Sequence, residues 1–264
     1  MNDMPKDLGR RAVLKGAAAV PVAPSLAAVL ASPALAEAAA STLETVTIET
    51  PSGRSVSASL ALPRTAPAPA VMLIHEWWGL NNQIKAVAAE YAAAGYAALA
   101  IDLYDGSLTD DPAVARTLVQ SVDAQAGAET TTAWIEWLRA HDRTTEKLGT
   151  VGWCFGGGWS LNASLAAPVD ATVIYYGNVA KSAAELASLK GPVLGHFATE
   201  DQYINQDMVT GFEAAMAEAD KPLTVHWYEA NHAFANPTGA RYDEEDAQLA
   251  WSRTQAFFEA NLKD

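Results

Sequence analysis

Hydrophobic and polar residues follow two different patterns along the chain. Residues 43–49 and 55–62 alternate between apolar and polar, as in a half-buried β-hairpin, and Pro51-Ser52-Gly53 between them is typical of a turn. From residue 70 onward, short apolar runs typical of buried parallel strands are followed by segments with apolar residues at helical spacing. Strands are expected at 70–74, 96–101, 147–152, 171–176, 192–197 and 223–228, and helices at 84–94, 112–126, 129–141, 155–166, 205–219 and 247–258. This alternation predicts a single α/β domain, with a doubly wound, mostly parallel sheet covered by helices on both faces.

The first 36 residues have the pattern of an export signal. A basic stretch that includes Arg10-Arg11 precedes an alanine-rich apolar run, and Ala34-Leu35-Ala36 supplies a small-x-small cleavage pattern. The arginine pair resembles a twin-arginine signal. Prolines interrupt the apolar run, which disfavours a membrane anchor. We therefore expect residues 1–36 to be removed and residues 37–264 to form a periplasmic or secreted domain that does not insert stably into a membrane.

The chain of 264 residues is acidic, with 31 Asp and Glu against 17 Lys and Arg, a net charge of −14. The expected export signal holds four basic and two acidic residues, so the net charge of the mature domain is −16. Nucleic acids and anionic membranes attract clustered basic residues, so neither is expected as a partner. The same charge disfavours a strongly anionic substrate. The sequence leaves the oligomeric state open.

No metal or cofactor is expected either. The single cysteine, Cys154, excludes an intramolecular disulfide and any multi-thiolate metal site. His75-Glu76 could begin a zinc-protease motif, but position 79 is a glycine where the second histidine ligand would stand.

A glycine-flanked cysteine stands between a predicted buried strand and a predicted helix. The segment reads Gly152-Trp153-Cys154-Phe155-Gly156. Small residues two positions before and after a nucleophile are required where a tight turn brings backbone segments together. Such a turn would project Cys154 from the carboxyl edge of the sheet, at a helix N-terminus that stabilises a thiolate. We therefore interpret Cys154 as a nucleophile rather than as a structural cysteine.

A nucleophilic cysteine needs a base, and the base needs an orienting carboxylate. In a doubly wound sheet, both must lie on loops at the same carboxyl edge. Asp201 follows the predicted strand at 192–197, and His232 follows the predicted strand at 223–228. The order nucleophile, acid, histidine is that of α/β-hydrolases. Glu200 is the rival acid, and the preference for Asp201 rests partly on a resemblance to a known family.

These motifs together resemble the dienelactone hydrolase family over nearly the whole mature chain. The matching positions are Gly152-x-Cys154-x-Gly156-Gly157, Asp201, His232-Ala233-Phe234 and Glu76. The resemblance implies an α/β-hydrolase fold with Cys154 as nucleophile, His232 as base and Asp201 as its orienting acid. It also implies that the Glu76 carboxylate contacts the resting cysteine and exchanges partners when substrate arrives.

The resemblance extends to the oxyanion hole and the substrate. Backbone N–H groups of Phe155 and Trp77 would form the oxyanion hole. Candidate substrate-pocket side chains are Trp78, Tyr104, Tyr176, Phe234 and Asn236. Family members that act on dienelactones commonly hold the substrate carboxylate with two arginines, and the matching positions here are Gly106 and Asn236. An acidic substrate is therefore disfavoured, unless Arg116 or Arg241 supplies a substitute cation.

The sequence thus predicts a cysteine-dependent hydrolase of small-molecule lactones or esters, acting through an acyl-enzyme. Two alternatives stay open at this stage. One is an enzyme of the same fold that processes a different small electrophile. The other is a non-catalytic or redox-sensing protein that uses Cys154 as a switch.

Overall fold

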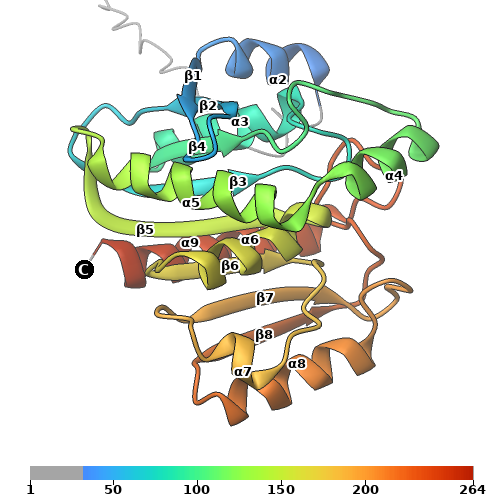
Figure 1. The fold of residues 1–264 in the computed structure, drawn as a ribbon. Coiled ribbons are helices and arrows are strands. Elements are labelled where there is room, and N and C mark those ends of the chain that lie inside the picture. The colour runs from blue at the N-terminus through green and yellow to red at the C-terminus, as the bar shows by residue number, and fades with distance from the viewer. Residues whose placement is uncertain (1–31, 264) are drawn as a thin grey trace, which may run out of the picture.

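The computed structural model describes residues 32–263, which form an eight-stranded sheet in the order β1-β2-β4-β3-β5-β6-β7-β8 (Figure 1). The strands are β1 (Glu44–Glu49), β2 (Ser55–Ala61), β3 (Ala68–Ile74), β4 (Ala97–Ile101), β5 (Thr144–Trp153), β6 (Ala171–Tyr175), β7 (Val193–Ala198) and β8 (Leu223–Tyr228). β2 pairs antiparallel with β1 and with β4, and the remaining neighbours are parallel. The predicted hairpin and the mostly parallel sheet are both confirmed.

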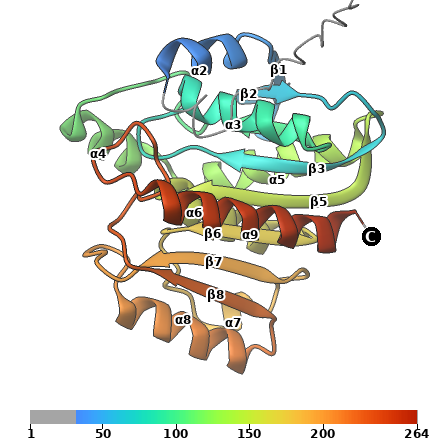
Figure 2. The same ribbon diagram turned by 180° about the vertical axis from the view of Figure 1, so that it is seen from behind.

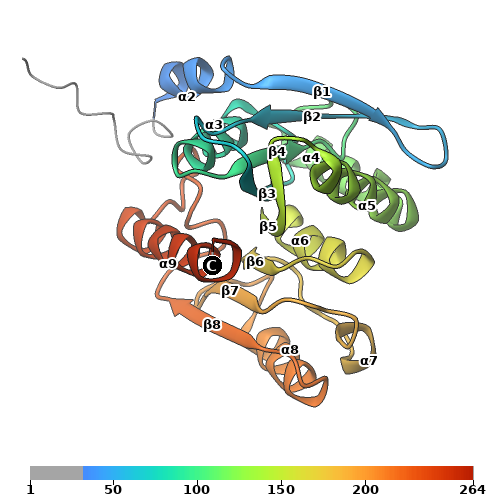
Figure 3. The same ribbon diagram turned by 90° about the vertical axis from the view of Figure 1, so that its left-hand side faces the viewer.

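Helices cover both faces of this sheet. They are α2 (Pro33–Ala40), α3 (Asn82–Ala93), α4 (Pro112–Ser121), α5 (Ala124–Ala140), α6 (Phe155–Ala166), α7 (Ala183–Leu186), α8 (Gln206–Glu218) and α9 (Glu244–Leu262). α3 and α9 lie on one face, and α5, α6 and α8 lie on the other (Figure 3). α9 runs across the middle of its face (Figure 2). The apolar runs of β3 and β4 are buried because helices pack against both of their sides.

The connections of the sheet change direction between β3 and β5. From β3 the chain moves to β4 on one side, and it returns to β5 on the other. The loops that leave the carboxyl ends of β3 and β5 therefore diverge, which is where α/β sheets bind their ligands. Glu76 and Cys154 lie on these two loops.

Two helix boundaries differ from the sequence prediction for an identifiable reason. The helices expected at 112–126 and 129–141 divide at residues 122–123 instead of 127–128. Asp123 is the N-cap of α5, and its side chain accepts a hydrogen bond from the backbone N–H of Ala126. α9 begins three residues before position 247, because Asp243 caps it in the same way.

The helix α2, which the sequence did not predict, contains the expected cleavage motif. Ser32 caps α2, and Ala36 is buried in the cluster that includes residues of α3. A cut after Ala36 would therefore divide a packed helix. The basic stretch and the apolar run of the expected export signal lie outside the described residues. No helix in residues 32–263 is both long enough and apolar enough to cross a membrane.

Candidate active site

Cys154 occupies the tight turn between β5 and α6. Its backbone has φ of 56° and ψ of −116°, a conformation that is unfavourable for a residue with a side chain. A Cβ atom at Gly152 would lie 1.9 Å from the carbonyl oxygen of Gly156, and one at Gly156 would lie 2.2 Å from that of Ile74. Only glycine fits at either position, so the predicted reason for both glycines is confirmed.

His232 lies between Asp201 and Cys154. Its Nδ1 is 2.6 Å from Oδ2 of Asp201, and its Nε2 is 3.1 Å from Sγ of Cys154. The second carboxylate oxygen of Asp201 accepts hydrogen bonds from the backbone N–H groups of Tyr203 and Ile204, at 2.7 and 3.0 Å. The rival acid, Glu200, is exposed and accepts a hydrogen bond from the Asn231 amide. The structure thus brings Asp201, and not Glu200, to the histidine.

The electrostatics of this chain of contacts favour a charged imidazole. Burial lowers the pKa of His232, but its hydrogen bonds to Asp201 and Cys154 outweigh burial and raise that pKa to about 10. Burial raises the pKa of Asp201, but the His232 contact and the two backbone donors more than reverse this and lower it. An imidazolium 3.1 Å from the sulfur stabilises a thiolate.

Glu76 is buried beside this group, but its partners differ from those implied by the family resemblance. One carboxylate oxygen accepts a hydrogen bond from the Tyr176 hydroxyl at 3.3 Å, and the other accepts one from Nδ2 of Asn236. Burial raises the pKa of Glu76, although both hydrogen bonds and the nearby His232 oppose this rise. Among the described residues, no hydrogen bond joins Glu76 to Cys154, which instead contacts His232.

His75, which sequence analysis did not assign to the site, holds two of its loops together. The fully buried ring contacts the Glu76 carbonyl oxygen through Nδ1 at 2.6 Å, and Nε2 accepts a hydrogen bond from the backbone N–H of Leu103 at 3.1 Å. This pattern fits the neutral tautomer that carries its proton on Nδ1, and burial lowers the pKa of His75. The imidazole thereby joins the carboxyl ends of β3 and β4. Its position directly after a strand was the available sequence signal.

The two amides expected for the oxyanion hole have no hydrogen-bond acceptor among the described residues. Phe155 is the first residue of α6, and Trp77 follows Glu76 on the loop after β3. β3 and β5 are paired up to Ile74 and Gly152, so the two loops leave the sheet side by side. A free N–H at a helix N-terminus is suited to stabilise negative charge.

The predicted pocket residues divide into two groups. Trp78 is half-buried, and its ring centroid is 4.7 Å from that of Trp77, the residue predicted for the oxyanion hole. The other four predicted pocket residues are almost fully buried; they are Tyr104, Tyr176, Phe234 and Asn236. Sequence analysis missed Tyr203, which is exposed beside His232.

Gly106 and Asn236 stand where relatives that act on dienelactones have arginines, and no other cation of residues 32–263 replaces those arginines at the site. Gly106 has open space around it, and its backbone N–H donates to Asp102. Arg54 lines a cavity of about 460 Å³ that also includes Gly106, but its guanidinium donates to the Ala126 carbonyl on α5. Arg116 and Arg241 are exposed and form no hydrogen bond or ion pair with the site residues within 32–263.

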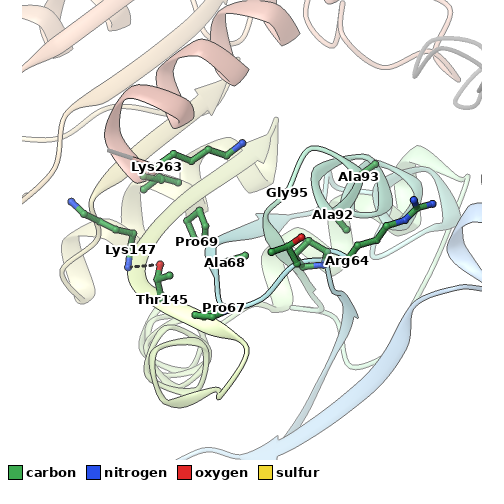
Figure 4. Close-up of a pocket in the computed structure, with 13 residues that line it drawn as sticks. Arg64, Pro67, Ala68, Pro69, Ala92, Ala93, Gly95, Thr145, Lys147 and Lys263 are labelled. Atoms are coloured by element: carbon green, nitrogen blue, oxygen red, sulfur yellow. Dashed lines mark hydrogen bonds between the residues drawn. The ribbon is translucent and has the colours of Figure 1, made fainter.

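A larger cavity, of about 800 Å³, lies at the opposite edge of the sheet, near the amino ends of β3 and β5 (Figure 4). Three basic residues line it; Arg64 is exposed, and the two lysines have structural partners. Lys263 donates to the Ala94 carbonyl at the C-terminus of α3, and Lys147 pairs with Asp170 at 3.3 Å. A cation at a helix C-terminus stabilises the helix dipole, so Lys263 has this role, and the charge of Lys147 is paired; neither lysine indicates an anion site. In the part of the chain that the structure describes, no group of three His, Cys, Asp or Glu side chains could hold a metal ion.

Comparison with known proteins places this chain in a family. Over 229 residues the chain is 30% identical to the carboxymethylenebutenolidase of Pseudomonas putida, covering 81% of this chain and 95% of that protein. Over 229 residues it is 27% identical to carboxymethylenebutenolidase 1 of Cupriavidus pinatubonensis, covering 83% and 97%. A dienelactone hydrolase-like promiscuous phosphotriesterase from metagenomic libraries shares the fold, with a TM-score of 0.76 at 21% identity over 83% of this chain and 99% of that one. The profile of the dienelactone hydrolase family matches residues 56–262, so this chain belongs to that family of α/β-hydrolase enzymes.

Proposed function

We propose that this enzyme hydrolyses neutral lactones or small carboxylic esters, with Cys154 as the nucleophile. The observation that carries the proposal is the position of His232, which contacts the Asp201 carboxylate through one ring nitrogen and the Cys154 sulfur through the other. Such a chain of nucleophile, base and orienting acid is the arrangement that activates a side chain for acyl transfer.

In the first half-reaction, the Cys154 thiolate attacks the substrate carbonyl carbon, and the carbonyl π electrons move to the oxygen. The backbone N–H groups of Phe155 and Trp77 stabilise this oxyanion. When the tetrahedral intermediate collapses, the bond from carbon to the alcohol oxygen breaks. The His232 imidazolium protonates that leaving oxygen, which yields a thioester and an alcohol; in a lactone, the alcohol stays attached to the acyl chain.

In the second half-reaction, neutral His232 accepts a proton from water as the water oxygen attacks the thioester carbonyl. Collapse of the second tetrahedral intermediate breaks the bond from carbon to sulfur. The carboxylic acid leaves, and the thiolate is again paired with imidazolium. Asp201 keeps the proton of Nδ1 directed toward its carboxylate, so that Nε2 faces the sulfur throughout.

The preference for neutral substrates rests on the two positions that lack arginine. Gly106 offers no side chain, and the Asn236 amide is already bound to Glu76 and Thr238. A carboxylate in a partly buried site is costly without a paired cation, and arginine is the side chain best suited to pair it. The net charge of −14 acts in the same direction.

Hydrolysis of p-nitrophenyl acetate tests the proposal. Wild type should release p-nitrophenol in an initial burst of one equivalent if deacylation is the slower step, and the acetyl group should appear on Cys154 by mass spectrometry. Cys154→Ala should abolish both the burst and the steady-state rate. Activity in Cys154→Ala close to that of wild type would refute the role of the cysteine.

A further inference from the structure

We propose that His75 is a positioning residue that fixes the peptide unit between Glu76 and Trp77, so that the Trp77 N–H stays directed at the oxyanion formed during acyl transfer. The inference rests on the proposed function, in which this N–H is one half of the oxyanion hole. It gives a buried histidine, which is neither nucleophile nor base, an effect on the rate of the reaction.

The peptide unit between Glu76 and Trp77 is bonded on its carbonyl side alone. The Glu76 carbonyl oxygen lies 2.6 Å from Nδ1 of His75, and it accepts a second hydrogen bond, at 3.2 Å, from the backbone N–H of Gly79. The N–H of Trp77 has no acceptor among residues 32–263. The peptide is trans, so its C=O and N–H point in opposite directions within one plane. A donor that holds the carbonyl therefore also sets the direction of the free N–H.

The proton of His75 that serves this contact is fixed from the other side of the ring. Nε2 accepts a hydrogen bond from the backbone N–H of Leu103 at 3.1 Å, and since an N–H can only donate, Nε2 carries no proton. The proton of the neutral ring therefore lies on Nδ1, which donates to the Glu76 carbonyl. Burial lowers the pKa of His75, so the ring keeps this neutral form at neutral pH. The Asp102 carboxylate, 3.8 Å from Nε2, is beyond hydrogen-bond distance.

His75 also contacts the segment that carries the other half of the oxyanion hole. Its ring is stacked on that of Phe155, with centroids 5.8 Å apart and an angle of 23° between the planes. A Cβ atom at Gly156 would lie 2.4 Å from the His75 carbonyl oxygen, so the first turn of α6 packs directly against the backbone of His75. Helical geometry sets the N–H of Phe155, since this residue is the first of α6. Trp77 lies outside any helix or strand, so its N–H depends on the contacts of the Glu76 carbonyl.

Two physical effects follow from the contact between His75 and the Glu76 carbonyl. It limits rotation of the peptide unit, so the Trp77 N–H needs no reorganisation when the oxyanion forms. It also polarises the amide, because a hydrogen bond accepted by the carbonyl strengthens the N–H of the same peptide by about 10–30%. Loss of a whole oxyanion-hole donor lowers kcat by about 10²–10³. Without the imidazole the Gly79 N–H still holds the carbonyl, so we expect a smaller loss, of about ten- to a hundredfold.

Two substitutions separate this role from that of a structural tie between β3 and β4. In His75→Asn the amide nitrogen is two bonds from Cβ, as Nδ1 is, so it can donate to the Glu76 carbonyl. In His75→Gln the amide oxygen is three bonds from Cβ, as Nε2 is, so it can accept from the Leu103 N–H. The kcat/KM for p-nitrophenyl acetate reports the acylation step. It should fall about ten- to a hundredfold in His75→Gln and by less than about threefold in His75→Asn.

Alkylation of Cys154 by iodoacetamide is the control measurement, because it displaces iodide from a saturated carbon and forms no oxyanion. Both variants should therefore be alkylated at the wild-type rate, and circular dichroism checks that they fold. Equal slowing of alkylation and ester hydrolysis in His75→Gln would indicate a general distortion of the site and would overturn the positioning role.

Nuclear magnetic resonance of wild type tests the same contact without a substitution. Protonated and unprotonated ring nitrogens of ¹⁵N-labelled histidine differ in chemical shift, and His75 should carry its proton on Nδ1. A proton on Nε2 would overturn the proposal, because Nδ1 would then have nothing to donate to the Glu76 carbonyl.

Two kinetic results would also overturn it. His75→Gln could hydrolyse the ester as fast as wild type, or His75→Asn could lose as much activity as His75→Gln. A failure of the proposed function would look different, because wild type itself would then not hydrolyse p-nitrophenyl acetate. His75 would still carry its proton on Nδ1, but no oxyanion would form, and the role assigned to His75 would fail with the proposed function.

Discussion

The Tyr203 ring meets the His232 imidazole nearly edge to face, with ring centroids 5.4 Å apart and an angle of 72° between the planes. The Tyr203 side chain is 66% exposed, an unusual position for a large aromatic residue beside a candidate base. Its backbone N–H, and not its side chain, binds Asp201. The ring is therefore free to cover the substrate without taking part in the contacts that orient the base.

Replacing Tyr203 by alanine should weaken substrate binding while leaving the chemical step nearly unchanged. Loss of one aromatic contact is worth about 0.5–1.5 kcal/mol, so KM for an aromatic ester should rise by about two- to tenfold. kcat should change less than KM. Tyr203→Phe is the matched control and should behave like wild type. A fall in kcat with unchanged KM would place the ring in the chemistry instead.

Asp201→Asn should reduce turnover by about two to four orders of magnitude, because an amide cannot hold the imidazole in the tautomer that directs Nε2 at the sulfur. The neighbouring carboxylate provides the control, since Glu200 is exposed and bound to Asn231. Glu200→Gln should therefore retain nearly full activity. Steady-state kinetics on p-nitrophenyl acetate measure both. Equal losses in the two variants would argue against a special role for Asp201.

The strand-end pattern, together with the family resemblance, predicted which residues meet at the site. Parallel strands bring their carboxyl ends to one edge, so Cys154, Asp201 and His232 could be placed together although 78 residues separate the cysteine from the histidine. The partners of Glu76 could not be predicted in this way. Its contact with Asn236 joins loops 160 residues apart and depends on which way one amide faces. Sequence order carries no information on that orientation.

The helix α2 was missed for a related reason. Its first half, residues 33–36, was assigned to an export signal, and the burial of Ala36 in the core cluster shows that this segment packs. The division between α4 and α5 at Asp123 follows from a side-chain cap that a search for hydrophobic periodicity does not detect. Local capping and tertiary packing thus account for the main differences.

Stability should fall as the pH drops below about 6.5, because His75 and His196 are buried in their neutral forms. Burial lowers the pKa of both side chains below the ordinary value of 6.5. Below that pH the unfolded chain takes up protons that the folded protein does not. The free energy of unfolding should therefore fall by up to about 1.4 kcal/mol per histidine per pH unit. Glu76 opposes part of this loss, since its raised pKa lets the folded state bind a proton first.

Urea denaturation at about pH 6.5 and about pH 5 measures this difference. His232, whose pKa is raised to about 10, stabilises the folded protein increasingly as the pH falls toward 6.5, so a comparison from a higher pH would mix the two effects. His196 contacts the Tyr228 and Thr254 hydroxyls, so His196→Gln keeps a polar group there that does not titrate. That variant should lose less stability between the two pH values than wild type does. An identical pH dependence in the two proteins would remove His196 from the explanation.

We also propose that the protein is exported by the twin-arginine route, as Arg10-Arg11 suggests. Replacing both arginines with lysine should leave unprocessed precursor in the cytoplasm, whereas wild type should give a shorter periplasmic product. Amino-terminal sequencing of that product also locates the cut relative to Ala36, which is buried in α2. Normal processing of the double-lysine variant would show that another type of signal operates.

The site should prefer an uncharged substrate to one that carries a carboxylate. A dienelactone carboxylate would find no arginine at positions 106 and 236, and the Asn236 amide is already bonded to Glu76 and Thr238. Each charge-assisted hydrogen bond that is missing is worth about 1.5–3 kcal/mol, so the absence of two corresponds to about two to four orders of magnitude in selectivity.

The methyl ester of a lactone acid should therefore be hydrolysed at the lactone ring with a higher kcat/KM than the free acid. Raising the ionic strength should change this ratio little, because the preference arises from local pairing inside the site and not from long-range attraction. The two substrates differ in charge at one carboxyl group, which makes them a matched pair. A higher kcat/KM for the free acid would mean that a cation from elsewhere, such as Arg241, reaches the site when substrate is bound, since Arg241 is exposed and makes no ion pair in residues 32–263.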